Sequence, residues 1–440
     1  MTGPSPVRIV TSAMVADSDA LMRRHLRRNV LALGSDLTLY MVGAAFASQA
    51  TIIPAFAAHL GAPNLVIGAI PAVITLGWLL PGLFAAGHTE TLAAKLPFVV
   101  RYTIWERVPY LAMALVAFFV AARAPGAALG LLLLCLLAMS GVSGALMPAW
   151  MDIIGHAVPQ GIRGRFFAAS NAVANVGGLG VSFLAAAILA AWPAPQSYGV
   201  CFVGASVFMA LSLIALLLTR EIPSGEPAAP ATPLSVYLAR IPSLLRRDRN
   251  MAWFLAARAA GVVGVMSTGF FTVYALRTFS APAWYAGFFT TMLLLGQVVG
   301  NLALGWLADR AGNRVVLVVG TAGIVGANLV ALAAPSIELF NLVFVLDGLY
   351  EAAMLTSGLN VLLELAPAPA ERPTYVGLGR TAVAPVAFAA PLVAGLVADA
   401  VGFAALFAVS AAFSALSLGL FAARFRDPRA LARARGVASG

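Results

Sequence analysis

The stretch GAALGLLLLCLLA at residues 126–138 contains no charged side chain, and it decides the class of fold. Similar runs recur along a chain of 440 residues that is 61% hydrophobic and 10% charged, whereas roughly 25% of residues are charged in an ordinary soluble domain. Long uninterrupted apolar runs predict membrane-spanning helices, because a transmembrane β-barrel needs segments of about 10 residues with alternating hydrophobicity. These features exclude a water-soluble globule and predict an all-α membrane protein.

Hydropathy windows of about 19 residues predict twelve transmembrane helices. Each helix needs about 20 apolar residues to cross roughly 30 Å of hydrocarbon, so twelve helices use about 240 residues and leave about 200 for loops and tails. The predicted spans are 31–58, 65–87, 100–122, 126–149, 166–191, 197–218, 251–275, 284–307, 315–335, 338–364, 378–400 and 403–424.

The spans form two groups of six that a proline-rich segment separates. Residues 219–250 hold five prolines and an arginine cluster, which is typical of a linker. We therefore predict an N-terminal six-helix bundle at 31–218 and a C-terminal six-helix bundle at 251–424. The cytoplasmic tails are 1–30 and 425–440.

The two groups of spans repeat part of their pattern at an offset of 219 residues. In the second and eighth spans, two glycines and a following acid have the same spacing. A parallel repeat of six helices predicts a pseudo-two-fold axis along the membrane normal. The matched pairs are Gly68 with Gly287, Gly77 with Gly296, Glu90 with Asp309, and Lys95 with Arg314.

The basic residues indicate on which side the termini lie. With both termini in the cytoplasm, all but four of the 27 lysines and arginines lie on that side, as the positive-inside rule expects. The formal charge of +10 therefore reflects membrane orientation rather than nucleic-acid binding. We expect a multi-pass protein of the cell (cytoplasmic) membrane with both termini in the cytoplasm. The four exceptions are Arg107 and Arg258 inside spans, and Arg123 and Arg277 outside.

The cytoplasmic turn between the eighth and ninth spans carries the strongest local motif, Gly305-Trp-Leu-Ala-Asp309-Arg310-Ala-Gly312-Asn-Arg314. Gly305 permits close approach of the eighth helix to a neighbour, and Gly312 permits a tight turn. Asp309 can accept hydrogen bonds from a helix N-terminus. Arg310 and Arg314 anchor the loop in the cytoplasm.

This motif resembles the GxxxD(R/K)xGR(R/K) loop signature of the major facilitator superfamily, with Asn313 in place of the first terminal arginine. A weaker copy with Glu90 and Lys95 lies between the second and third spans, and Arg163 belongs to a second family-like element between the fourth and fifth spans. The resemblance implies two six-helix bundles that rock about a central site lined by spans one, four, seven and ten. It also implies that the two loops latch the halves on the cytoplasmic side, with Glu90 near the start of the eleventh span and Asp309 near the start of the fifth.

The motifs that the chain lacks indicate its source of energy. The only lysine is followed by leucine, so the sequence has neither a GK(S/T) phosphate cradle nor an aspartyl-phosphate DKTGT segment. Gly377 to Ala382 form a GxGxxA variant, but no strand precedes it, which argues against dinucleotide binding. Since no nucleophile with a base and no ligand cluster is recognisable, we expect no enzyme activity, no metal and no cofactor. Transport driven by a solute or ion gradient is what remains.

Two carboxylates, Asp347 and Glu351, lie four residues apart in the tenth predicted span. Ionisable groups at this depth are costly, so they are functional candidates by default. Two carboxylates on one helix face repel when both are ionised, and the low dielectric favours the neutral acid, as a proton-coupling site requires. The alternative is a pair that is permanently hydrogen-bonded for packing.

Other polar residues within the spans are further candidates. Asp36 and Arg258 lie at similar depths and 222 residues apart, so one hypothesis places them face to face as an anion-binding or gating pair, and the other treats them as interfacial charges that reach the headgroups. Glu106 and Arg107 are adjacent, so we expect them to point to different faces and to need separate partners within the first half. Contact with a solute, or the joining of helices, is also expected for Gln49, Asn175, Gln297 and Asn360.

The sequence thus predicts a monomeric secondary transporter that works by alternating access in the lipid bilayer and couples a small-molecule substrate to a proton. The apolar lining favours efflux of a hydrophobic, drug-like compound. Uptake of a sugar or an organic anion, with Arg258 as the anion contact, is an alternative. A non-transporting scaffold or sensor on the same fold is another, against which the short linker at 219–250 argues.

Overall fold

The computed structural model describes residues 6–90, 92, 94–222, 245–368 and 371–429. Within these ranges, the side chains at 6–20, 83, 84, 86–88, 90, 373 and 380 are not described. The secondary structure of the described residues is helical, which confirms the predicted fold class. Among the described residues, twelve segments are long and apolar enough to cross a membrane.

The helices divide into two sets along the chain. The first set is α1 (Pro6–Phe46), α2 (Ile52–His59), α3 (Asn64–Glu90), α4 (Leu96–Leu115) with a π-helical extension (Val116–Val120), α5 (Pro125–Ala157), α6 (Gln160–Ala191) and α7 (Gln196–Leu217). The second set is α9 (Arg249–Gly264), α10 (Thr268–Thr278), α11 (Tyr285–Ala311), α12 (Asn313–Ala333), α13 (Ile337–Leu365), α14 (Arg372–Thr381), α15 (Ala384–Ala400) and α16 (Phe403–Ala423).

The first span differs most from its predicted bounds of 31–58. The continuous spanning segment is Leu21–Phe46, and the chain then leaves the helix before α2 begins. The break contains polar residues, and Ile53 N–H donates to the Ser48 carbonyl oxygen at 2.9 Å within it. A window of about 19 residues averages over such a short polar break. The seventh span breaks between α9 and α10 at Ser267, which lies 219 residues after Ser48.

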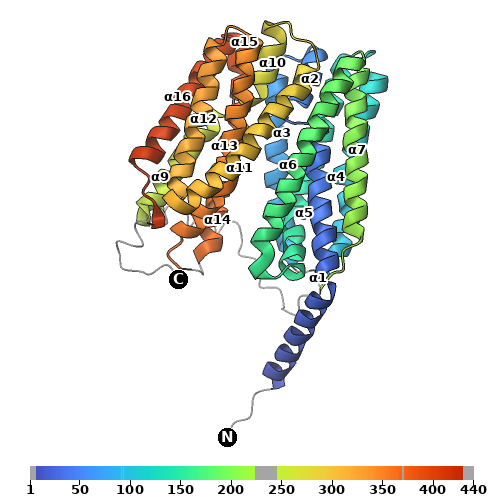
Figure 1. Ribbon diagram of the computed structural model, residues 1–440, viewed down its shortest axis with the longest axis vertical. Helices are drawn as coiled ribbons and strands as arrows, with labels where there is room; N and C mark the ends of the chain where they lie inside the picture. The colour runs from blue at the N-terminus through green and yellow to red at the C-terminus, as the bar shows by residue number, and fades with distance from the viewer. Residues whose placement is uncertain (1–5, 91, 93, 223–244, 369–370, 430–440) are drawn as a thin grey trace.

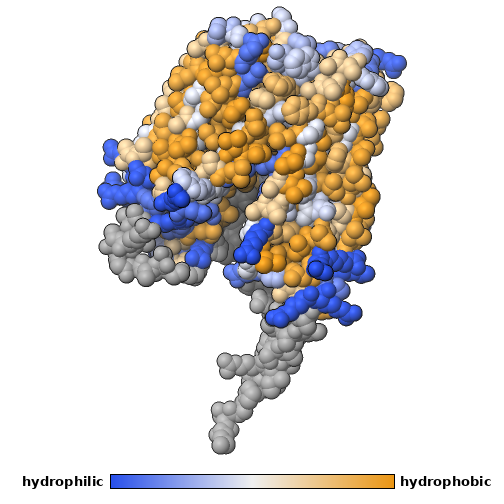
Figure 2. All heavy atoms as spheres, viewed as in Figure 1, coloured by the Kyte–Doolittle hydropathy of each residue, from blue (hydrophilic) through white to orange (hydrophobic). Residues whose placement is uncertain are grey.

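The two sets of helices form two bundles that lie side by side (Figure 1). Both ends of the chain lie at the same end of the molecule (Figure 1), which we call the termini end, and the opposite end is the far end. On the face that Figure 2 shows, apolar side chains cover most of the surface between the two ends, and hydrophilic ones gather at the ends. This distribution is that of a protein whose sides contact lipid.

The two bundles touch mainly where α3 packs against α15 and α6 packs against α11. The α3–α15 approach is so close that a Cβ on Gly395 would lie 2.6 Å from the Asn64 carbonyl oxygen. Asn64 is the first residue of α3 and Gly395 is near the end of α15, so this contact lies at the far end. At the termini end, a hollow separates the bundles (Figure 2).

The hydrogen bonds between the bundles lie at the far end as well, as far as the described residues show. Asp399 Oδ1 and Oδ2 accept from the Asn64 and Leu65 N–H groups at 3.1 and 3.0 Å. Arg277 donates to the Asn64 side chain and to the Ala62 carbonyl oxygen, both at 3.0 Å. The remaining bonds are Thr51 with Thr290 at 2.6 Å, Ser182 with Thr291 at 2.8 Å, and Thr272 to the Ala50 carbonyl oxygen at 3.2 Å. The molecule is therefore closed at the far end and open at the termini end.

Candidate functional site

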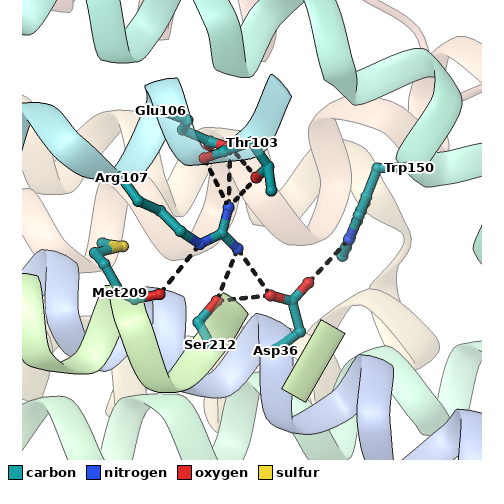
Figure 3. Close-up of polar contacts among 7 residues, drawn as sticks. All are labelled: Asp36, Thr103, Glu106, Arg107, Trp150, Met209 and Ser212. Carbon is teal, nitrogen blue, oxygen red and sulfur yellow. Dashed lines mark hydrogen bonds and ion pairs between the residues drawn. The ribbon is translucent and has the colours of Figure 1, made fainter. Parts of the chain in front are cut away.

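A buried polar cluster lies within the first bundle (Figure 3). At its centre, the Arg107 guanidinium of α4 pairs with the Asp36 carboxylate of α1, with Nη2 2.9 Å from Oδ1. Ser212 of α7 donates to the same oxygen at 2.6 Å. The indole Nε1 of Trp150 in α5 donates to the other oxygen, Oδ2, at 3.1 Å. Helices distant in sequence thus converge on Asp36.

The Arg107 guanidinium directs each of its three nitrogens at acceptors. Nε donates to the Met209 carbonyl oxygen at 3.1 Å, and Nη2 donates to Asp36 and to Ser212 Oγ, each at 2.9 Å. Nη1 donates to the Thr103 hydroxyl and lies 3.5 Å from Glu106 Oε2. A buried charge persists only when it is paired and hydrogen-bonded, and Arg107 meets both conditions.

This arrangement corrects two predictions. Asp36 does not face Arg258 across the pseudo-axis, because its cationic partner is Arg107 of the same bundle. Glu106 and Arg107 do not need separate partners, because both contact Thr103, whose hydroxyl donates to Glu106 Oε2 at 3.1 Å. Two residues predicted at the same depth in the membrane need not lie on neighbouring helices. A long arginine side chain can also turn back toward its own helix.

A cavity of about 130 Å³ borders this cluster. Asp36, Glu106 and Arg107 supply its charged side chains, and Thr103 and Ser143 its aliphatic hydroxyl groups. The sequence analysis did not select the aromatic residues of its wall, because tryptophans and tyrosines are common in spans and no spacing marks these. The rest of the lining is Leu37, Tyr40, Met41, Trp78, Val99, Leu146, Met147, Trp150 and Leu216.

The second candidate site is the pair Asp347 and Glu351 in α13, here called the acid pair. Asp347 is 1% exposed. Its Oδ1 lies 3.4 Å from the Thr268 hydroxyl of α10, and its Oδ2 has no hydrogen-bond partner among the described residues. Glu351 accepts a hydrogen bond from the Gln297 amide of α11. Within the described residues, neither carboxylate has a cation within salt-bridge distance.

Arg258 in α9 lies near the same helix but does not neutralise the acid pair. Its Nη1 donates to the Met354 sulfur of α13 at 2.8 Å. No salt bridge of Arg258 occurs in the part of the chain that the structure describes. In the second bundle, the Arg258 cation is therefore separate from the two carboxylates of the acid pair.

Of the other polar candidates, only Gln297 joins one of these two groups. Gln49 and Asn360 are exposed, and Asn175 is half-buried. The Asn360 amide donates to the Thr356 carbonyl oxygen of its own helix at 2.7 Å. The described residues show no hydrogen bond from the Gln49 or Asn175 side chain. Asn328, which the sequence analysis passed over, joins helices instead, since it accepts from the Ser267 hydroxyl at 2.7 Å.

The loop motif has a clear structural role at Gly312 and Arg314. Gly312 has a φ of +87°, which favours glycine, and it ends α11 in a tight turn as predicted. Arg314 Nε donates to the Phe421 carbonyl oxygen at 3.1 Å and thereby ties the loop to the end of α16. Arg310 lies over the Trp306 ring, 4.2 Å from its centroid.

The predicted packing role of Gly305 is wrong for this conformation. Nothing lies within 4 Å of where a Cβ on Gly305 would be, because the bundles are apart at the termini end. Asp309 is exposed and has no hydrogen bond or ion pair among the described residues, so its latch role stays a prediction. The side chain of Glu90 lies outside the described residues.

The two basic residues of the first-half loops contact their own bundle. Lys95 Nζ lies 2.6 Å from Asp152 Oδ2. Arg163 donates to the Gly155 and Val158 carbonyl oxygens at 2.6 and 3.2 Å. Within the described residues, no group of three or more His, Cys, Asp or Glu side chains is placed to hold a metal ion.

Comparison with solved structures identifies the architecture. The fold is similar to that of the nucleoside transporter NupG, with a TM-score of 0.68 and 15% identity over 90% of this chain and 100% of that one. It is similar to a D-xylose-proton symporter, with a TM-score of 0.65 and 14% identity over 91% and 98% of the two chains. It is also similar to a bacterial homologue of the human lysosomal transporter Spinster in an inward-facing and occupied conformation, with a TM-score of 0.63 and 15% identity over 89% and 95%. The fold is thus that of a membrane transporter.

The family follows from the sequence comparison. The profile of the Major Facilitator Superfamily matches residues 262–439, which include most of the second bundle, whereas no curated protein matches the sequence. Residues 262–439 thus match the major facilitator superfamily, as the loop motif within them suggested. This match and the fold are both those of multi-pass membrane transporters.

Proposed function

We propose that this transporter couples the movement of its substrate to a proton, and that the acid pair takes up and releases that proton. One observation carries the proposal. Asp347 is buried with one carboxylate oxygen unpartnered among the described residues, next to Glu351 and without a neutralising cation. Asp36 is the contrasting case, because Arg107 neutralises it.

The physical reason is the cost of an isolated buried charge. A carboxylate that leaves water without a cationic partner loses several kcal/mol or more, and a second carboxylate four residues along the helix adds repulsion. A bound proton removes both penalties. When the bundles change sides and the pair meets water again, the charged form is solvated and the proton leaves. Thr268 and Gln297, the neighbours that donate to the pair, lie on α10 and α11 of the same bundle, so the contacts change only if these helices also shift relative to α13 during the cycle.

The positive-inside rule supports an orientation for this cycle. All but four of the 27 basic residues would lie on the termini side, so we place the termini in the cytoplasm. The hollow at the termini end then faces the cytoplasm, and the hydrogen bonds at the far end seal the extracellular side. The state described is accordingly the cytoplasm-facing state of an alternating-access cycle in the cell membrane.

For direction and cargo, we favour proton-driven efflux of a hydrophobic, drug-like compound. The cavity in the first bundle supports this choice, because its wall is mainly aromatic and aliphatic. The alternative is uptake of an organic anion, which the Arg258 guanidinium favours, since it has no carboxylate partner among the described residues. A sugar would also fit an uptake transporter, but no feature of the two sites selects one.

The test is transport in proteoliposomes with a compound that a thermal-shift panel identifies as a ligand. Glu351→Gln should abolish accumulation under an imposed pH gradient and preserve counterflow exchange, because exchange needs no net proton movement. Glu338→Gln is the matched control, since Glu338 is an exposed glutamate at the start of the same helix. If the Glu351→Gln protein accumulates the compound at the normal rate, the acid pair is not the coupling site.

A further inference from the structure

We propose that the cavity in the first bundle binds an organic cation, with Glu106 as its counter-ion and the neighbouring aromatic side chains as its walls. This inference names a substrate class and so deepens the proposed function. It rests on the proposed function only for the transport step. The binding step stands on the geometry of the cavity.

The charge balance of the cavity is the first argument. Its lining contains two acids, Asp36 and Glu106, and one base, Arg107, so it carries one excess negative charge when all three are ionised. Arg107 is committed to Asp36, at 2.9 Å with two further donors on that carboxylate. Glu106 lies farther from the guanidinium, at 3.5 Å. The uncompensated charge therefore resides on Glu106.

The hydrogen-bond donor of Glu106 is a neutral group. The Thr103 hydroxyl donates to Glu106 Oε2 at 3.1 Å. A neutral donor does not cancel the negative charge of a carboxylate. The side chain is 10% exposed, so a cation that reached it would meet a carboxylate with little competing water.

The walls supply the second argument. Trp78 and Trp150 contribute aromatic faces, and Met41 and Met147 contribute polarisable sulfur. The Tyr40 ring also lines the cavity, but the Arg107 guanidinium already lies over it, 5.7 Å from its centroid. Aromatic faces around a carboxylate are the chemistry that recognises quaternary and primary ammonium groups, since a desolvated cation–π contact contributes about 2 kcal/mol. Thioether side chains adapt to irregular apolar shapes. An anion would meet the excess negative charge, and a neutral polar solute would leave that charge uncompensated.

Size and access are the third argument. The cavity has a volume of about 130 Å³, and an apolar protein cavity of about 150 Å³ holds benzene. A trimethylammonium or benzylammonium head is of this size. Trp78 and Met41 are 37% and 45% exposed, so the cavity opens at the surface of the bundle, and the remainder of a larger molecule can extend outward past them.

The experiment is equilibrium binding to the purified full-length protein in detergent, measured by calorimetry at constant pH. The probes are benzyltrimethylammonium, neutral benzyl alcohol and benzoate. We expect the cation to bind at least tenfold more tightly than the alcohol, and benzoate to bind more weakly than either. Equal affinity of the cation and the alcohol would overturn the proposal, and this comparison requires no variant.

Two variants localise the site. Glu106→Gln keeps the shape and the Thr103 contact, and it should weaken cation binding at least tenfold while leaving benzyl alcohol unchanged. Trp78→Leu should weaken cation binding severalfold, whereas Trp192→Leu, which changes an exposed tryptophan outside the cavity, should not. Unchanged cation affinity in the folded Glu106→Gln protein would overturn the assignment.

The outcomes also separate this inference from proton coupling. Cation binding that survives Glu351→Gln, with loss of accumulation, supports both proposals. No cation binding to the wild-type protein, together with proton-driven transport of another compound, defeats the cation site alone. Cation transport that is insensitive to the pH gradient and to Glu351→Gln defeats proton coupling alone.

Discussion

The contact of Asp399 with the start of α3 holds the far end closed, and its removal should shift the protein toward the opposite state. In Asp399→Asn, the amide can still accept one of the two backbone N–H bonds, which measure 3.1 and 3.0 Å, but the negative charge is lost. A carboxylate at a helix N-terminus contributes about 0.3–1 kcal/mol through the helix dipole, and a hydrogen bond to a charged group about 1.5–3 kcal/mol.

Asp399 is exposed, so water screens part of this energy. We therefore expect a net shift of about 1–2 kcal/mol toward the state that is open at the far end. By the conversion of about 1.4 kcal/mol per factor of ten, the open population rises roughly 5- to 30-fold.

The assay is the rate of maleimide labelling of a cysteine in the α6–α11 contact. Ser182 is fully buried and bonded across the bundles to Thr291, so Ser182→Cys reacts only when the far end opens. The background replaces the two native cysteines, Cys135 and Cys201, by alanine. The labelling rate should rise 5- to 30-fold with Asp399→Asn and stay unchanged with Glu338→Gln, because Glu338 contacts no residue of the first bundle among those described. A change of less than twofold with Asp399→Asn would refute the reasoning.

Further predictions concern packing and the buried charges. Gly395→Leu should prevent closure of the far end, because even a Cβ would lie 2.6 Å from the Asn64 carbonyl oxygen; the labelling assay should show fast reaction, and slow reaction would contradict this. Thr51→Val removes a buried hydrogen bond of 2.6 Å between the bundles. The loss of about 1 kcal/mol from the closed state should raise the labelling rate several-fold, and an unaltered rate would contradict this. Arg107→Met leaves the buried Asp36 carboxylate without its cation and should destabilise the protein by about 3–5 kcal/mol in thermal unfolding. Arg258→Met breaks no ion pair and should cost far less, so equal losses would show that Arg107 is not the neutralising group.

The sequence alone was sufficient to predict the class of protein and the number of its membrane spans. Hydrophobic runs give the number of spans, because the thickness of the hydrocarbon sets a minimum helix length. The tight turn at Gly312 and the family resemblance of its loop were also readable, since both depend on residues adjacent in the chain. The acid pair could be selected because a carboxylate in a span is costly wherever its neighbours lie.

Only the tertiary structure decided which groups meet. It paired Asp36 with Arg107 rather than with Arg258, brought Gln297 to Glu351, and placed Trp78 and Trp150 around Glu106. It also showed that Asp399 and Arg277, which lie at the ends of α15 and α10, close the far end. Hydropathy and spacing record how deep a residue lies and on which face of its own helix. The identity of the neighbouring helix depends on packing between segments far apart in the chain. This packing therefore determines which partners the buried charges contact.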